Sequence, residues 1–198
     1  MTQEMNYSSV LTGASFMLYE FKQVAALKEQ GLSDAEIRKK AIDENLFQHE
    51  KISSLQRGFP SILRRVNALD EELLKLLANE SLETAKVINL YAIMKTDRLF
   101  HEFMIEVIEE KFQNNDYTIE KKDVNTYFTT KAEQHESIAN WKEATIQKLK
   151  LVYMNILLGA GLLESKKTGE LNRLIIDDQI KDHLRRIGDA RYLQAMGE

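Results

Sequence analysis

The 198-residue sequence contains no cysteine, a single proline and eight glycines. The absence of cysteine excludes a disulfide framework, a thiolate metal site and a cysteine nucleophile, and it fits a reducing compartment. The scarcity of proline and glycine leaves few places for sharp turns, which favours helices over short strands.

The sequence also lacks a long apolar run. Its longest one covers residues 151–163 and is interrupted by Asn155. A helix that spans a membrane needs roughly 20 apolar residues, so we interpret this run as a buried helix. Residues 1–6 have neither the cationic start nor the apolar core of a signal peptide. We therefore expect a cytoplasmic protein.

Motifs of self-contained active sites are missing as well. The sequence has no GxGxxG, GxxxxGK[ST], HExxH or GxSxG motif, and its four histidines share no ligand spacing. Asp177, Asp178 and Lys181 weakly resemble a nuclease cluster, but an acidic helix start explains them more simply. We predict no enzyme activity, no cofactor and no metal site.

Local signals predict a mainly all-α protein. Gly31 should end a first helix over residues 9–30, and the capping box Ser33–Glu36 should open a second helix that ends near residue 45. Ser53 or Ser54 should cap the next helix, which Pro60 should break or kink. Further helices are expected over 61–69, 71–77, 82–95, from Asp97, from Asp123, over 137–158 and over 178–187, with a short tail helix after Asp189.

Residues 162–176 are the one predicted exception to the helical pattern. They should form two short strands around Lys166-Lys167-Thr168-Gly169. In one interpretation, this hairpin follows a helix as the wing does in a winged-helix domain and brings cations to DNA. In the other, it only covers the core. The sequence leaves both interpretations open.

Charge is unevenly distributed along the chain, although the formal net charge is only −4. Residues 38–65 carry seven cations against three anions, and residues 121–168 carry eight against five. Between them, residues 66–120 carry five cations against twelve anions. A phosphate backbone responds to charge within a Debye length of about 10 Å, so a local basic region can bind it despite the acidic average.

Two regions are therefore candidates for binding nucleic acid, and a solvated basic surface is the alternative interpretation of both. In the first, cations of adjacent helices would contact phosphates, and the helix N-terminus near Ser53 would add backbone donors. In the second, the tip of the hairpin would make a further contact. The candidate residues are Arg38, Lys39, Lys40, Lys51, Arg57, Arg64 and Arg65, with Lys166 and Lys167 in the second region.

The order of several short motifs resembles the BrxA family of small proteins from BREX bacteriophage-defence systems. The motifs are residues 7–9, 12–16 and 18–20, Gly31-Leu32-Ser33, Asn45-Leu46-Phe47-Gln48, Arg64-Arg65, Asp97-Arg98-Leu99-Phe100, Trp141 and Ala160-Gly161-Leu162-Leu163. The resemblance covers nearly the whole chain. It implies a NusB-like helical fold and binding of double-stranded DNA without catalysis.

We therefore expect one helical domain over residues 1–198, which allows sub-lobes at 1–69, 70–120 and 121–198. The expected partners are duplex DNA and other BREX proteins, with no membrane and no small-molecule substrate. Two alternatives stay open. One is a protein–protein adaptor whose acidic residues Glu102, Glu106, Glu109 and Glu110 face a basic partner. The other is NusB-like binding of RNA.

Overall fold

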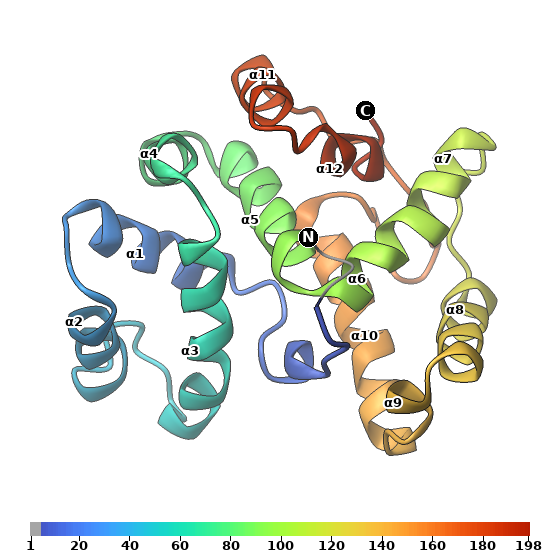
Figure 1. The fold of residues 1–198 in the computed structure, drawn as a ribbon, viewed down its shortest axis with the longest axis horizontal. Coiled ribbons are helices and arrows are strands. Elements are labelled where there is room, and N and C mark those ends of the chain that lie inside the picture. The colour runs from blue at the N-terminus through green and yellow to red at the C-terminus, as the bar shows by residue number, and fades with distance from the viewer. Residues whose placement is uncertain (1–4) are drawn as a thin grey trace.

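Helices make up nearly all the regular structure. The structure, a computed structural model, describes residues 5–198, and Figure 1 traces its helices in chain order. They are α1 (Leu18–Glu29), α2 (Asp34–Arg38), α3 (Ile52–Asn67), α4 (Glu71–Asn79), α5 (Leu82–Thr96), α6 (Arg98–Phe103), α7 (Glu110–Gln113), α8 (Lys121–Gln134), α9 (Glu136–Ala139), α10 (Glu143–Ala160), α11 (Asp178–Arg186) and α12 (Ala190–Ala195). A 3-10 helix, η2 (Val10–Gly13), precedes α1, and the π-helices η3 (Lys39–Asp43) and η4 (Met104–Glu109) extend α2 and α6. The predicted all-α class is confirmed.

Helix α5 forms the centre of the core. Figure 1 shows α1–α4 on one side of it and α6–α10 on the other. Every side chain from Val87 to Met94 is buried, which is the pattern of a helix surrounded by others. It packs against α1, α3, α4, α6 and α10. One hydrophobic cluster consequently extends from Leu11 to Met196.

The predicted buried helix around residue 151 is α10. It buries Leu149, Val152, Tyr153, Ile156 and Leu157 against the rest of the protein. Within residues 5–198, no helix combines the length and apolar character needed to cross a membrane.

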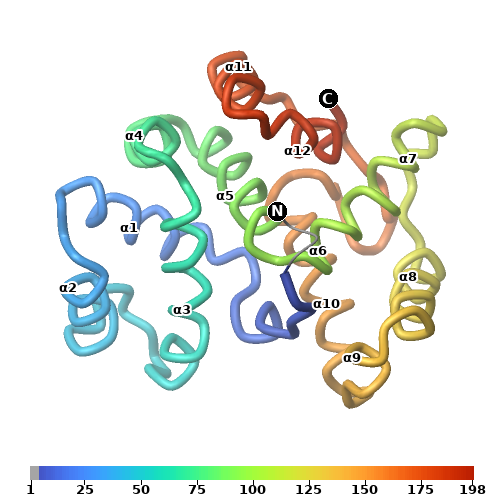
Figure 2. The backbone as a smooth tube through the Cα atoms, viewed as in Figure 1, coloured from blue at the N-terminus to red at the C-terminus, as the bar shows by residue number. Residues whose placement is uncertain are grey.

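The N-terminal segment, residues 5–17, joins the two groups of helices. Figure 2 shows it in blue between α3 and α10. The Asn89 side chain of α5 donates to the Phe16 carbonyl oxygen at 2.6 Å. On the other side, the Phe16 ring lies so close to α10 that a Cβ at Gly159 would come within 2.6 Å of it. A glycine at position 159 therefore makes room for this segment.

The starts of α2, α4, α5 and α6 are set by capping residues that can be recognised in the sequence. The Ser33–Glu36 capping box is formed, and the side chains of Asp70, Ser81 and Asp97 each accept a hydrogen bond from a backbone N–H of the first turn. Gly31 adopts the left-handed conformation, with φ of +85°, just after α1. These interactions are local, and this is why the sequence alone predicts them.

The prediction of a helix over residues 9–30 is wrong in its first half. Helix α1 begins only at Leu18, and Met17 before it has a φ of 44°. The carbonyl groups of Ala14 and Phe16 accept hydrogen bonds from side chains of α3 and α5 rather than from helical N–H groups. Contacts across the fold thus replace the local helix.

Pro60 was predicted to break or kink a helix here, and helix α3 is not broken at this residue. It runs through Pro60, and neither Ser53 nor Ser54 caps it, because Lys51 is the N-cap residue and provides no side-chain bond. Pro60 removes one helical hydrogen bond on the exposed side. The opposite side buries Leu55, Phe59, Ile62 and Val66, and this packing holds the helix together.

Three other boundaries differ from prediction. The helix expected from Asp123 begins at Lys121, because Glu120 and Asp123 form a capping box. The helix expected over 137–158 is divided into α9 and α10. Residues 162–176 do not form the predicted two-stranded hairpin within the described chain. They make isolated antiparallel bridges instead: Leu163 pairs with Leu171, and Glu170 pairs with Thr118. Residues 169–172 therefore hydrogen-bond both to residues 162–164 and to residues 117–119.

Candidate nucleic-acid interface

The cations predicted to contact DNA in the first region lie on α2, η3, α3 and the loop before α3. A hydrogen-bonded turn organises that loop, because the Asn45 side chain accepts from the His49 N–H at 3.0 Å. His49 in turn contacts Glu20 of α1 at 2.8 Å. The turn therefore fixes Lys51 and the start of α3 relative to α1.

The exposed side of α3 carries cations and no acid. Residues 52–67 contain no Asp or Glu, and Arg57 and Arg64 are both exposed, two helical turns apart on the same side. Their Cα atoms are therefore roughly 10 Å apart along the helix axis. Among residues 5–198, Arg57 donates only to Ser53 O and Ser54 Oγ of its own helix and pairs with no carboxylate, so its charge is not compensated there.

Arg65 does not belong to this surface, which corrects its place among the predicted phosphate contacts. Its side chain is 0% exposed, and its guanidinium donates to the carbonyl oxygens of Ala14 and Phe16. Burial lowers the pKa of Arg65 to about 10, and the charge of Asp97 opposes this shift. A side chain held in this way cannot reach a phosphate.

The other cations of the first region are accessible. Arg38, Lys39 and Lys51 are exposed, whereas Lys40 is half-buried. Among the described residues, only Lys40 of these four pairs with a carboxylate, that of Glu44 at 3.9 Å. The first region thus keeps six accessible cations, Arg38, Lys39, Lys40, Lys51, Arg57 and Arg64.

Lys166 and Lys167 lie in the turn after α10, in the other half of the molecule. Both are exposed, and Lys166 donates to the Asn155 side chain. They are not brought together with the cations of α2 and α3, so the predicted candidates form two separate surfaces.

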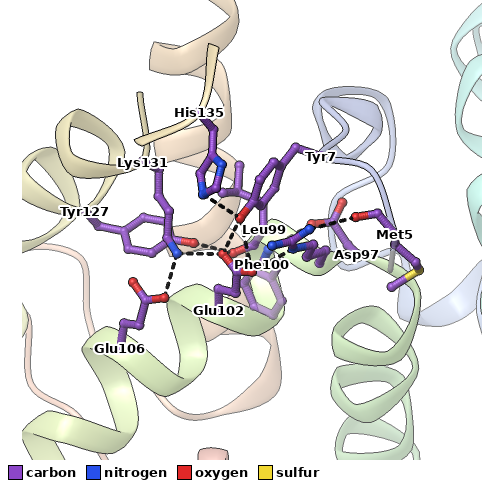
Figure 3. A network of polar contacts seen from close by, with 11 residues as sticks. Met5, Tyr7, Asp97, Leu99, Phe100, Glu102, Glu106, Tyr127, Lys131 and His135 are labelled. Atoms are coloured by element: carbon purple, nitrogen blue, oxygen red, sulfur yellow. Dashed lines mark hydrogen bonds and ion pairs between the residues drawn. The ribbon is translucent and has the colours of Figure 1, made fainter. Parts of the chain in front are cut away.

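A polar network that the sequence did not predict joins the N-terminal segment to α6 and α8 (Figure 3). The Glu102 carboxylate accepts hydrogen bonds from Tyr7 Oη at 2.9 Å, Arg98 Nε at 2.7 Å and Lys131 Nζ at 2.6 Å. Burial raises the pKa of Glu102, but these three donors outweigh burial and hold it below its ordinary value. The partners are 4, 29 and 95 residues away in sequence, so only the i,i+4 pair with Arg98 is recognisable beforehand.

This network also changes the set of acids available to a basic partner. Glu102 is engaged by three donors, and Glu106 pairs with Lys131 at 2.6 Å. Glu109 and Glu110 form no ion pair within residues 5–198, and Glu110 is exposed. Of the four acids expected on an adaptor surface, only these two keep an unpaired charge.

A cavity of about 320 Å³ adjoins the network. Its lining includes His101, whose pKa falls to about 4 because the side chain is buried and lies near the charge of Arg191. Across residues 5–198, no group of three or more His, Asp or Glu side chains is placed to hold a metal ion.

Comparison with known proteins identifies the family. The BrxA family model matches residues 5–188. A BREX protein BrxA of Bacillus cereus (strain H3081.97) is 36% identical over 197 residues, which cover 99% of this chain and 98% of that protein. A second BREX protein BrxA, from Paramagnetospirillum magneticum (strain ATCC 700264 / AMB-1), is 22% identical over 92% of both chains.

A solved structure agrees with the fold. The crystal structure of an uncharacterized protein from Magnetospirillum magneticum superposes with a TM-score of 0.84, covering 97% of this chain and 98% of that one at 21% identity. With a family model that spans nearly the whole sequence and a full-length relative at 36% identity, this chain belongs to the BrxA family of BREX bacteriophage-defence proteins.

Proposed function

We propose that this BrxA protein binds duplex DNA without catalysis, through phosphate contacts made by the accessible cations of the first region. The observation that carries the proposal is the acid-free exposed side of α3. Arg57 and Arg64 are spaced to reach separate phosphates there, and Lys51 and the exposed first turn of α3 lie at its start. Arg38, Lys39 and Lys40 extend the same positive charge onto α2 and η3.

Binding of this kind should show little sequence preference and strong dependence on salt. Phosphate contacts release counterions, and contacts to base edges are what specify sequence. If Arg57 and Arg64 each contact one phosphate, replacing either of them should reduce the slope of log affinity against log salt concentration by roughly 0.9.

Fluorescence anisotropy with a labelled random duplex at several salt concentrations tests the proposal. The variant Arg57→Glu/Arg64→Glu should lose duplex affinity by roughly tenfold or more and show a shallower salt slope. The control Lys75→Glu/Arg185→Glu makes the same change of net charge at two exposed positions of α4 and α11 and should retain affinity. Equal losses in both variants would show that net charge alone is responsible, and an unchanged affinity of the first would refute this interface.

An RNA hairpin of matched length, used as competitor, separates DNA binding from the RNA binding expected of a NusB-like protein. Preferential competition by RNA would favour the RNA interpretation. The adaptor alternative retains support from the unpaired Glu109 and Glu110. A partner captured in the presence of nuclease, and released when these two acids are reversed, would favour it over DNA binding.

A further inference from the structure

A groove between α8 and α10 is lined by both basic and apolar side chains. Its volume is about 440 Å³, and Lys121, Lys150 and Lys166 line it with Val124, Leu151 and Met154. We call this surface the basic groove. Its three lysines come from α8, from α10 and from the turn after α10, so the fold rather than a sequence run assembles them.

The lysines of the basic groove are oriented but not neutralised. Lys150 donates to the Asn125 side chain at 2.9 Å, and Lys166 donates to the side chain of Asn155. None of the three lysines pairs with a carboxylate among residues 5–198. The acid in the lining, Glu120, is already 3.0 Å from Lys122. The groove therefore presents an unbalanced positive charge.

The apolar part of the basic groove is unusually open. Leu151 is 64% exposed in the middle of α10, and Met154, one turn later, is half-buried beside it. A leucine and a methionine next to three lysines suit a partner that offers both an apolar side chain and carboxylates. Phosphates alone would leave the leucine uncovered.

The same chain carries a surface of the complementary kind. Ile105 is 38% exposed on η4, and Glu106, Glu109 and Glu110 lie around it at the junction with α7. We call these four residues the acidic ridge. Glu109 and Glu110 have no ion-pair partner in the described chain, and burial raises the pKa of Glu109, which a nearby cation would offset.

We propose that copies of this protein associate with the acidic ridge of one copy in the basic groove of another. Ile105 would cover Leu151 and Met154, and Glu109 and Glu110 would face the three lysines. Because the ridge and the groove are different surfaces, the contact is heterologous, and one copy can both give and receive it. Each interface would pair the exposed Ile105 with the apolar side chains of the basic groove, and the two unpaired carboxylates with its lysines.

Two charge-reversal variants test the contact. The groove variant is Lys121→Glu/Lys150→Glu, and the ridge variant is Glu109→Lys/Glu110→Lys. Lys121 and Glu110 are exposed, Lys150 and Glu109 are half-buried, and none of the four belongs to the buried core. Sedimentation velocity from micromolar to hundreds of micromolar protein should show wild-type association at low salt that weakens as salt shortens the Debye length. Each variant alone should stay monomeric over this range.

The decisive sample is the equimolar mixture of the two variants. The groove variant still has a wild-type acidic ridge, and the ridge variant still has a wild-type basic groove. One copy of each should therefore form a heterodimer, and no larger assembly should appear because the remaining surfaces are both altered. Circular dichroism confirms that each variant is folded. Wild-type protein that stays monomeric at low salt, or folded variants that fail to associate when mixed, would overturn the proposal.

Two further samples separate this contact from DNA binding. The variant Arg57→Glu/Arg64→Glu should associate as wild type does, because α3 contributes nothing to the groove or the ridge. The groove variant should keep its affinity for duplex DNA. If it instead loses duplex affinity as strongly as the α3 variant while self-association is unchanged, the groove binds DNA and the proposed contact is wrong.

Discussion

Arg65 Nη2 donates a hydrogen bond to the carbonyl oxygen of Ala14 at 2.6 Å, across 51 residues of sequence. The same guanidinium donates to the Phe16 carbonyl, and its Nε has no partner among the described residues. A fully buried cation thus ties the N-terminal segment to α3 and leaves nothing of its charge for a ligand.

Arg65→Met should therefore destabilise the protein without a direct effect on DNA contacts. It leaves the Ala14 carbonyl oxygen without its side-chain donor and removes one of the two donors to the Phe16 carbonyl oxygen, at a cost of about 2–4 kcal/mol of unfolding free energy. The neighbouring Arg64→Met, at an exposed position, should cost no more than about 0.5 kcal/mol. Urea unfolding followed by circular dichroism measures both. Equal costs would contradict the buried role of Arg65.

Asp97 should make the stability depend on pH. Burial raises its pKa from 3.8 to about 6, against the opposing effects of the Phe100 N–H and Arg65. The folded state therefore binds the proton more tightly than the unfolded state, so this group's contribution falls as pH rises from 3.8 to 6, by roughly 3 kcal/mol in all.

The variant Asp97→Asn checks this sign, since asparagine can still cap α6. The unfolding free energy of the variant minus that of wild type should rise between pH 4 and pH 7, because only wild type must bury a charge at the higher pH. Unfolding titrations across this range give the difference at each pH. A flat difference would show that Asp97 keeps an ordinary pKa.

Glu102→Gln should lower the unfolding free energy, because it weakens the polar network around this residue. The change removes the negative charge that Arg98 and Lys131 share, and Lys131 is only 6% exposed. We expect a loss of about 2–4 kcal/mol of unfolding free energy, because the buried Lys131 loses one of its two carboxylate partners and Arg98 loses the charge of its own. Glu133→Gln, at an exposed position of α8, is the control and should be nearly neutral. Thermal or urea unfolding compares the two variants.

Gly159→Ala should destabilise the protein although alanine favours helices. A Cβ at this position would lie 2.6 Å from Phe16 Cδ1, so overpacking should cost about 1–3 kcal/mol. Lys148→Ala, at an exposed position of the same helix, should be nearly neutral. Adding Phe16→Leu to Gly159→Ala should recover part of the loss in a double-mutant cycle. Strictly additive costs would show that the two residues do not interact.

Interactions between neighbouring residues are the part of this fold that can be predicted from the sequence. Ser33, Asp70, Ser81 and Asp97 mark helix starts because each side chain bonds a backbone group three residues away. Pro60 does not break α3, because burial of the opposite side of this helix outweighs one missing hydrogen bond. Residues 9–17 look helical by pattern, but side chains of α3 and α5 bind the carbonyl groups of Ala14 and Phe16, and residues 14–17 do not join the helix.

The candidate site shows the same division. Charge counting finds Arg57 and Arg64 correctly as surface cations, yet it includes Arg65, which shares a side of α3 with the buried Gly58 and Ser61. The helical spacing of positions 58, 61 and 65 was a signal that could have placed Arg65 inward. The network around Glu102 and the basic groove join distant segments, so no local pattern indicates them. The acidic ridge lies within residues 105–110, and its acids are visible in the sequence.

The position of residues 14–16 has a consequence for synthesis of the chain. Their binding partners are Arg65, Asn89 and finally Gly159, so these early residues leave the ribosome long before the last of their contacts exists. Until α10 has been translated, Phe16 has no complete site in which to pack. Residues 14–16 are translated early, but they can pack fully only after α10 has been translated, so the packing of this segment is a late step in folding.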